Sequence, residues 1–191
     1  MSEAKKHQHF IIHKPYGYLS QFVIRTNHKM KLLGDLYDFP EGTMAIGRLD
    51  KNSEGLLFLT TDGVESERVR GSKFEKEYYA QVDGLMTETA LQKLKSGVTI
   101  GIEGGHYQTK PCEASILNPK PIFPERTRRI RDERHGPTSW VSIILREGKF
   151  RQVRKMTAAV GFPTLRLFRM RIGEIWLGDL KPGEVRIVEE F

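Results

Sequence analysis

The chain has 191 residues, of which 38% are hydrophobic and 29% are charged, and its formal net charge is +7. This length and composition are ordinary for a domain that buries its own core, and no stretch approaches the roughly 18 continuous apolar residues of a membrane span. The N-terminus has charges and histidines where a secretory signal needs a longer apolar run. The single cysteine, Cys112, excludes an intramolecular disulfide and a cysteine-based metal cage, and we expect it to be a buried or half-buried small hydrophobe. We therefore expect a cytoplasmic protein without a membrane segment.

The positive charge is concentrated in the C-terminal third. Residues 126–171 contain 13 of the 31 Lys and Arg residues but only three acids, which gives this segment +10 and leaves −3 for the rest of the chain. A solvated surface is the plain explanation of a charge run. Eleven of the thirteen are arginine, however, and a guanidinium binds phosphate bidentately and stacks on bases. We therefore expect a polyanionic partner, nucleic acid in particular, whose binding weakens as salt rises.

The first half of the chain predicts mostly strands. Apolar runs bounded by turn residues indicate strands at 8–13, 44–47, 55–60 and 76–82. Pro15 and Gly17 impose a turn after the first of them, and Asp62 with Gly63 forms a turn signal after the third. No second cluster of ligands accompanies the three histidines near the first strand, so we expect surface histidines rather than a metal site. They are His7, His9 and His13.

The second half adds two helices and further strands. Thr87 as N-cap and Gly97 just beyond the end predict a helix over 87–96. A second helix is expected within 149–161, packed by one face and presenting cations from another. The residues at helical spacing on its packed face are Phe150, Val153, Thr157 and Val160. Further strands are expected at 106–117, 139–146 and 164–173.

The order of these elements defines a fold class. Strands outnumber helices and the helices do not alternate regularly with them, which predicts an α+β fold with a mixed, mostly antiparallel sheet and flanking helices. The segment 118–138 has four prolines, several basic residues and little periodicity. We expect it to be a long surface loop with a functional role.

The motifs of several large enzyme classes are absent from the sequence. It has no Walker loop, GxGxxG turn, HExxH helix or GxSxG elbow, so chemistry without a cofactor, or binding alone, remains. Asp50 lies in a polar turn between two apolar segments, which would hold a catalytic carboxylate rigidly. An Asx-turn or cap is the plain alternative for this residue. Glu54 raises a third possibility, a glycosidase-like carboxylate pair.

Four motifs follow one another along the chain. They are KPYGYLSQF, GRLDKNSEGLLFLTTDG, KEYYAQV and LREGKFRQVRKMTAAVGFPTLRLFRMRIG. In this order they resemble the RsuA family of pseudouridine synthases, from about His9 to Val188. The resemblance implies a pseudouridine synthase fold with a central active-site cleft, in a single two-lobed catalytic domain over 1–191 without a separate N-terminal RNA-binding domain. KPYGYLSQF and the later PTSW point to one branch of this family.

The resemblance also implies a reaction, the isomerisation of uridine in RNA without a cofactor or a metal. The glycosidic bond to the uracil nitrogen breaks, the base turns, and carbon 5 bonds to the ribose. The family nucleophile maps to Asp50, acting by covalent attack or by proton removal at the sugar, and both routes stay open. Tyr78, next to Tyr79, maps to the tyrosine beside the flipped uracil, although a core-facing strand aromatic is the alternative. Arg154 is implied to pair with Asp50 and to keep it ionised and oriented.

Further residues are expected to hold the RNA. Arg48 is expected to enter the gap left by the flipped base, with a simple phosphate contact as the alternative. Contacts to the RNA backbone are expected from Lys14, Lys149, Arg151 and Lys155. Gln152 is grouped with them as a hydrogen-bonding residue, its alternative being an ordinary helix-surface glutamine. Leu145 and Ile172 are candidates to pack against uracil, with a place in the core as the alternative.

One position departs from the family pattern. Lys155 precedes Met156 where many relatives have arginine, which keeps the charge but loses a bidentate fork and weakens one expected phosphate contact.

Together these inferences predict a monomeric pseudouridine synthase that acts on one uridine of 23S ribosomal RNA. A transfer RNA substrate and a non-catalytic RNA-binding ribosome assembly factor are the alternatives. Substrate choice is expected to lie in the 118–138 loop and the basic surface.

Overall fold

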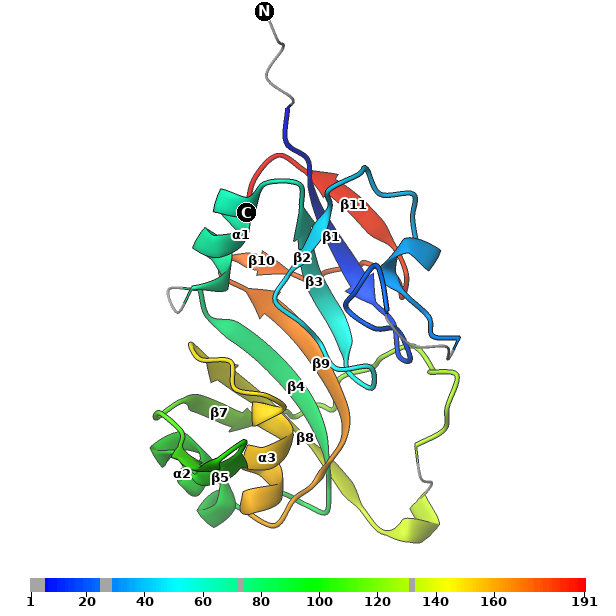
Figure 1. Ribbon diagram of the computed structural model, residues 1–191. Helices are drawn as coiled ribbons and strands as arrows, with labels where there is room; N and C mark the ends of the chain where they lie inside the picture. The colour runs from blue at the N-terminus through cyan, green and yellow to red at the C-terminus, as the bar shows by residue number, and fades with distance from the viewer. Residues whose placement is uncertain (1–5, 25–28, 72–73, 131–132) are drawn as a thin grey trace, which may run out of the picture.

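One twisted sheet runs through the computed structural model, which describes residues 6–24, 29–71, 74–130 and 133–191 (Figure 1). The strands are β1 His9–Lys14, β2 Met44–Ile46, β3 Glu54–Thr60, β4 Lys76–Asp83, β5 Thr99–Ile102, β6 Gly105–Gln108, β7 Glu113–Ile116, β8 Thr138–Leu145, β9 Thr164–Ile172, β10 Ile175–Trp176 and β11 Val185–Val188. The helices are α1 Gly63–Arg70, α2 Glu88–Ser96 and α3 Gln152–Ala159. The mixed, mostly antiparallel sheet with flanking helices confirms the predicted fold class.

Two halves of the sheet meet at a short parallel junction. The main order is β11-β1-β3-β9-β4-β8-β7, with β2 added to β3 and β10 to β9, while β5 and β6 form a separate hairpin. All of these pairings are antiparallel except β3 with β9, where only Glu54 pairs with Phe168 and Gly55 with Arg169. Gly55 has a φ of +105°, and a Cβ there would lie 2.3 Å from the Arg169 carbonyl oxygen. Only glycine therefore lets the two halves approach so closely.

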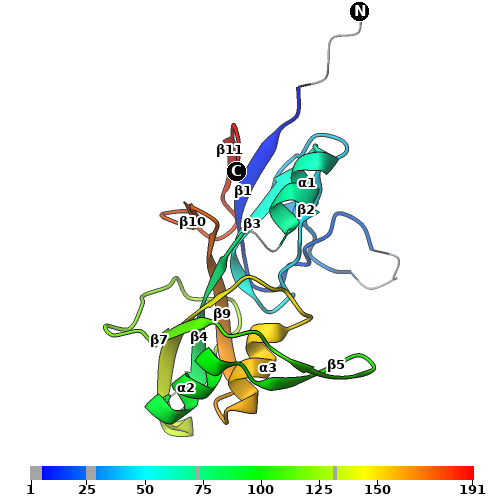
Figure 2. The same ribbon diagram turned by 90° about the vertical axis from the view of Figure 1, so that its left-hand side faces the viewer.

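Each half has its own apolar core. In the first half, β1 and β3 pack through Phe10, Ile12, Leu57 and Leu59, all of which are buried. In the second half, α2 and α3 cover β4 and β8. Figure 2 shows α1 and α3 on the same side of the sheet, while the loop between β7 and β8 crosses the other side. The side that carries α1 and α3 is the side on which the candidate site lies.

The local sequence signals place most elements correctly. Thr87 Oγ1 accepts a hydrogen bond from Ala90 N, and Gly97 follows α2 with a positive φ, as predicted. The expected strand over 106–117 is two strands, because the chain leaves the β5 hairpin and then pairs with β8. The turn expected at Asp62 is the start of α1, whose first amides donate to the Asp62 carboxylate. This helix is polar and buries only Ser66 and Val69, so it has no apolar stripe to reveal it.

Two expectations about burial are wrong. Phe150 lies before α3 and is 74% exposed, because Arg151 adopts a left-handed conformation and the helix begins only at Gln152. The buried face of α3 consists of Gln152, Val153, Met156 and Thr157. His13 is buried rather than at the surface, since β1 lies between β3 and β11, and its Nδ1 is 2.8 Å from the Leu180 carbonyl oxygen.

Two further structural expectations, the long irregular segment and the half-buried cysteine, are confirmed in the described parts of the chain. The segment 118–138 is irregular apart from a short 3-10 turn at Glu133–His135, and its residues 131 and 132 lie outside the described residues. Cys112 is half-buried, and burial raises the pKa of its thiol to about 11. None of the helices in the described ranges has the length and apolar character to cross a membrane.

Candidate active site

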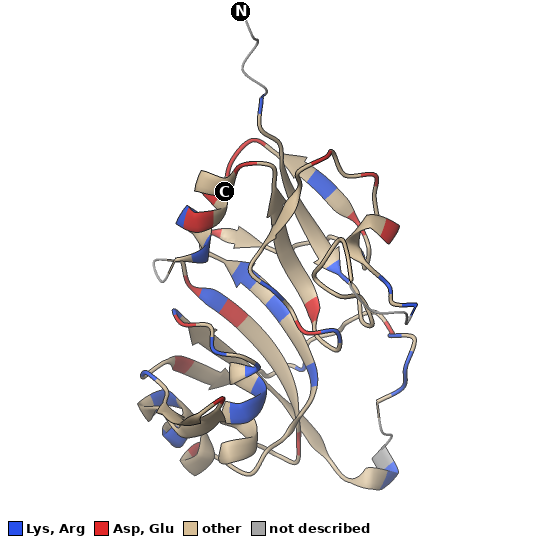
Figure 3. Cartoon of the chain, viewed as in Figure 1, with Lys and Arg blue, Asp and Glu red and all other residues tan. Residues whose placement is uncertain are grey.

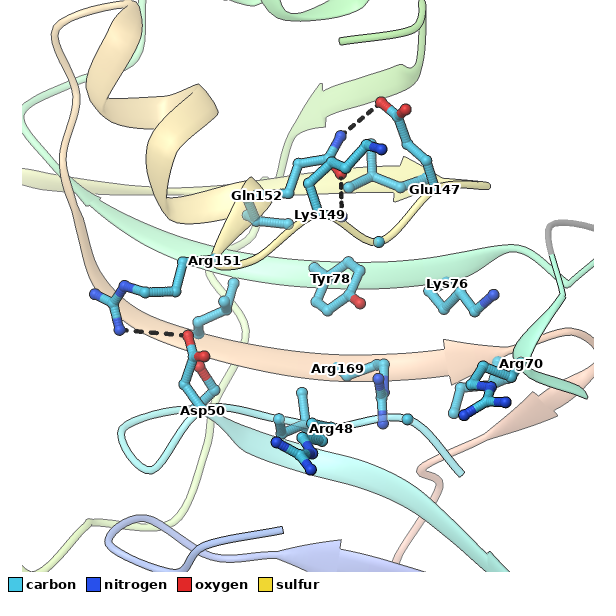
Figure 4. Close-up of a pocket in the computed structure, with 18 of the residues that line it drawn as sticks. Arg48, Asp50, Arg70, Lys76, Tyr78, Glu147, Lys149, Arg151, Gln152 and Arg169 are labelled. Carbon is cyan, nitrogen blue, oxygen red and sulfur yellow. Dashed lines mark hydrogen bonds and ion pairs between the residues drawn. The ribbon is translucent and has the colours of Figure 1, made fainter. Parts of the chain in front are cut away.

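A cavity of about 410 Å³ opens where the two halves of the sheet meet (Figure 4). It is lined from one half by the β2–β3 connection and α1, and from the other half by β4, β9 and the segment between β8 and α3. Its walls include Arg48, Asp50, Arg70, Lys76, Tyr78, Leu145, Arg146, Glu147, Lys149, Arg151, Gln152, Arg169 and Ile172. A space of this size accommodates a small organic group such as a nucleoside.

The cavity wall is strongly positive. Seven lysines and arginines line it, against two carboxylates, Asp50 and Glu147. Lysines and arginines are spread over β9, α3 and the loops that face one another across the junction (Figure 3). Such a concentration of one sign attracts an anionic ligand. No group of three His, Cys, Asp or Glu side chains suited to a metal ion occurs in the described segments.

The backbone around Asp50 is held from both sides. The Ser20 hydroxyl accepts from Leu49 N at 3.0 Å and donates to Leu49 O at 2.9 Å. Ser53 N donates to Asp50 O at 2.9 Å, and Gly17 N donates to Lys51 O at 2.8 Å. The turn is therefore rigid, as its position between two apolar segments predicts. The contribution of Ser20 has no signal in the sequence beyond its place in KPYGYLSQF.

The Asp50 carboxylate contacts two arginines. Its Oδ2 lies 3.5 Å from Arg151 Nη1 and 3.7 Å from Arg154 Nε. Among the described residues no backbone amide donates to this carboxylate, so Asp50 is not an Asx-turn residue. Its Oδ1 has no donor within hydrogen-bond distance there either, and the side chain is 23% exposed. One carboxylate oxygen is thus oriented and the other is open to a ligand.

Arg154 does more than face Asp50. Its Nη2 donates to Asn52 O at 3.0 Å and to Ser53 Oγ at 3.1 Å, which clamps the turn that carries Asp50. Burial and the nearby Arg151 charge lower the pKa of the Arg154 guanidinium from its ordinary value. The Asp50 carboxylate raises this pKa, but by less. The structure therefore brings Asp50 and Arg154 together, as the resemblance implies.

The expected base-packing residues surround the middle of the cavity. Tyr78 is half-buried on β4 and lines the cavity, whereas its neighbour Tyr79 contacts Phe123 edge-on at a ring distance of 6.4 Å. Leu145 and Ile172 are 3% and 4% exposed and also line the cavity. Each belongs to an apolar core and also lines the cavity, and a contact with uracil stays a prediction.

Glu147 organises the segment that leads into α3. Its carboxylate accepts from Tyr107 Oη at 2.6 Å, Lys110 N at 3.0 Å and Gln152 Nε2 at 2.6 Å. Burial raises the pKa of Glu147, but these hydrogen bonds outweigh burial and hold it below its ordinary value. Gln152 Oε1 in turn accepts from Lys149 N at 2.9 Å. The sequence gives no separate signal for Glu147.

The expected RNA-contact residues fall into two groups. Arg48, Lys149 and Arg151 are exposed and line the cavity, where a ligand can reach them. Lys155 is half-buried, and its Nζ donates to Gly101 O at 2.7 Å. Gln152 is only 4% exposed, so the surface alternative is wrong for it and its hydrogen bonds support the loop instead.

Lys14 requires a correction. We expect it to contact the RNA backbone, but its side chain is fully buried and its Nζ donates to Pro15 O at 3.0 Å and Tyr18 O at 2.8 Å. Burial lowers the pKa of this lysine to about 7. Lys14 therefore closes the turn over residues 15–18, which contacts the Asp50 loop through the Gly17 N–Lys51 O hydrogen bond. Its ammonium group does not face a phosphate.

Glu54 does not form a pair with Asp50. It is 3% exposed, and both of its oxygens accept from Arg166, at 2.9 Å from Nε and 2.8 Å from Nη2. A carboxylate held in this way has no free oxygen for acid or base chemistry, which removes the glycosidase-like possibility.

The fold and this site define the class of protein. Residues 8–159 match the model of a family described as RNA pseudouridylate synthase. A solved structure titled "Crystal structure of pseudouridylate synthase" superposes with a TM-score of 0.76 at 26% identity, over 97% of this chain and 71% of that chain. The chain belongs to the RNA pseudouridylate synthase family, and the prediction that it is a pseudouridine synthase is confirmed.

Two relatives lie in one branch of this family. The chain is 41% identical over 181 residues to "Ribosomal large subunit pseudouridine synthase E" of Vibrio parahaemolyticus, covering 94% of this chain and 73% of the relative. It is 40% identical over 174 residues to a protein of the same name from Xanthomonas axonopodis pv. citri, covering 90% of this chain and 89% of the relative. These similarities agree with the branch that KPYGYLSQF and PTSW indicate.

Proposed function

We propose that this protein isomerises one uridine of 23S ribosomal RNA to pseudouridine, with Asp50 as the nucleophile. The observation that carries the proposal is the Asp50 carboxylate, fixed at the edge of a basic cavity with one oxygen oriented by arginine and the other open. The names of the two relatives support large-subunit ribosomal RNA as the substrate.

The chemistry divides into cleavage, rotation and rejoining. In one route the open Asp50 oxygen attacks C1′ of the ribose, and in the other Asp50 removes a proton from the sugar. In both, the C1′–N1 bond breaks and its electron pair stays with uracil. The base then turns and its C5 bonds to C1′, while the Asp50–C1′ bond breaks in the first route and the proton held by Asp50 returns to the sugar in the second. The C5 proton leaves, and N1 gains a proton. Substrate and product are isomers, so the reaction consumes no other reagent.

Further residues at and beside the cavity receive roles in this proposal. Tyr78, Leu145 and Ile172 pack against uracil and keep the detached base in place while it turns. Arg154 orients Asp50, and the exposed Arg48 reaches toward the space that the flipped base leaves in the RNA. Lys149 and Arg151 contact the RNA backbone at the mouth of the cavity.

Site-resolved mapping of pseudouridine tests this proposal. Total RNA is compared from cells with and without the gene, complemented by the wild-type gene or by Asp50→Asn. We expect one 23S position to lose pseudouridine and only the wild-type gene to restore it. A lost transfer RNA position would transfer the proposal to that substrate. An unchanged map, together with RNA binding by both proteins, would favour the assembly-factor alternative.

A further inference from the structure

Arg169 is a buried cation at the floor of the cavity with an unused donor. It lies on β9 beside Gly55, and its side chain is 5% exposed. Its Nε donates to Leu56 O at 2.8 Å. Its Nη2 is buried without any hydrogen-bond partner among the described residues. An unsatisfied buried donor of this kind costs free energy, so its presence calls for a partner that the protein itself does not provide.

Among the residues that the structure describes, no carboxylate compensates the charge of Arg169. Within the described ranges, no Asp or Glu oxygen lies within 4.0 Å of its guanidinium, in contrast to Arg166 on the same strand. Arg70 and Lys76 add further positive charge at this end of the cavity (Figure 4). Burial and the Arg169 charge both lower the pKa of Lys76. This part of the cavity is therefore prepared for an electron-rich group.

The position of Arg169 favours a base over a phosphate. Arg169 pairs in register with Tyr78 on the neighbouring strand, and both line the cavity. The exposed cations Arg48, Lys149 and Arg151 lie where an RNA backbone can reach them, whereas Arg169 is as deeply buried as the apolar residues of the wall. A phosphate stays with the backbone at the surface, but an extruded base enters the pocket.

We propose that Arg169 is a catalytic residue that donates a hydrogen bond from Nη2 to a carbonyl oxygen of the target uracil. This inference rests on the proposed function. When the C1′–N1 bond breaks, its electron pair moves to uracil and spreads over N1 and the carbonyl oxygens. The guanidinium stabilises this negative charge, and the interaction becomes stronger in the transition state than in the bound substrate.

Atom-specific substrates test the contact. RNA fragments that carry the mapped uridine are prepared with uridine, 2-thiouridine or 4-thiouridine at that position, because a thiocarbonyl is a weaker hydrogen-bond acceptor. Single-turnover rates are measured for wild type, Arg169→Met and Arg169→Lys. Arg171→Met serves as the matched control, since Arg171 is also on β9 but pairs with Glu75 and Glu77 outside the cavity.

We expect Arg169→Met to lower the single-turnover rate about 10²-fold, as the loss of one preorganised donor does, and Arg169→Lys to recover part of it. One of the two thio substitutions should slow the wild type and the Arg171→Met variant. The same substitution should have no further effect on Arg169→Met, because the contact is already lost. Thermal melting of each variant separates this effect from a loss of folded protein.

Other outcomes overturn the inference. Equal slowing of wild type and Arg169→Met by both thio substitutions would show that Nη2 does not contact a carbonyl. A methylphosphonate next to the target uridine replaces a charged phosphate. If it slowed the wild type but had no further effect on Arg169→Met, Arg169 would be assigned to the RNA backbone. A wild-type protein that forms no pseudouridine would overturn the proposed function and this role with it. Wild-type activity without coupling would overturn the role of Arg169 alone.

Discussion

Two carboxylates at the start of β3 lie in regions of opposite character. Glu54 is buried at the junction of the two half-sheets, and both of its oxygens are taken by Arg166, which also packs over the Phe168 ring at 4.5 Å. Asp50, in the preceding turn, meets its two arginines at 3.5 and 3.7 Å and keeps one oxygen open. A carboxylate beside arginine thus forms a closed structural pair in one region and keeps an open oxygen in the other.

The difference follows from what surrounds each group. A buried ion pair needs short, bidentate contacts to offset the loss of water, and such contacts leave nothing for a substrate. A carboxylate at the edge of a cavity retains solvent, so it tolerates longer contacts and a free oxygen. The first region should therefore govern stability and the second should govern activity.

The largest effect is expected from Asp50→Asn. The amide has the same shape but is no nucleophile and no base, so pseudouridine formation should fall at least about 10⁴-fold, as it does for other enzymes that lose a nucleophile. Single-turnover assays on 23S RNA measure the loss. The midpoint of thermal unfolding should stay close to that of the wild type, and activity within tenfold of wild type would contradict the role of Asp50.

The reverse result is expected from Glu54→Gln. This variant leaves the buried Arg166 charge without its carboxylate, which should lower the free energy of unfolding by about 3–5 kcal/mol. Urea titration measures the change, with Asp50→Asn as the matched control. The double variant Glu54→Gln/Arg166→Met should recover part of the loss. A Glu54→Gln protein as stable as the control would show that the closed pair contributes little.

Lys14 connects the two regions and should give the protein a distinctive pH dependence. Its pKa in the folded protein is about 7, below the roughly 10.4 of an unfolded lysine. Between these values the unfolded chain binds the extra proton, so the contribution of Lys14 to stability should increase as pH rises, by at most about 1.4 kcal/mol per pH unit. The protein should lose this contribution as pH falls toward 7.

The Lys14→Met variant isolates this effect. Unfolding free energies of both proteins are measured at several values between pH 7 and about 10, where the unfolded lysine stays largely protonated. The unfolding free energy of the wild type, relative to that of Lys14→Met, should increase as pH rises over this range. Parallel curves would show that Lys14 keeps an ordinary pKa in the folded protein.

The smallest effect is expected at the rim of the open region. Phe150 is exposed between the cavity-lining Lys149 and Arg151, and an aromatic ring in this setting is suited to stack on an RNA base. Phe150→Ala should weaken RNA binding by about 1 kcal/mol, the lower end of the range for such stacking. Fluorescence anisotropy at several salt concentrations measures the affinity.

The salt dependence distinguishes stacking from a phosphate contact. Phe150→Ala should leave the slope of log affinity against log salt unchanged. Lys149→Ala should reduce it by about one unit if it removes one phosphate contact. A reduced slope for Phe150→Ala would contradict the stacking role.

Local patterns in the chain predict much of the fold. Alternation and turn residues place β1, β3, β4, β8 and β9, and the caps Thr87 and Gly97 delimit α2, because these signals act between neighbours in sequence. The basic C-terminal third and the rigid turn around Asp50 are also local properties. The family motifs then indicate that Asp50 and Arg154 meet.

Burial and pairing were decided only by the tertiary structure. Lys14, His13 and Gln152 look like surface residues in the sequence, yet each is buried because distant segments cover it. Arg166 and Arg169 lie three residues apart on one strand, and nothing local distinguishes the paired cation from the unpaired one. The close approach of β3 and β9 at Gly55 gives Arg166 a carboxylate and leaves Arg169 facing the cavity. Which partner a charge meets depends on the packing of the two half-sheets, and no sequence-local pattern encodes that contact.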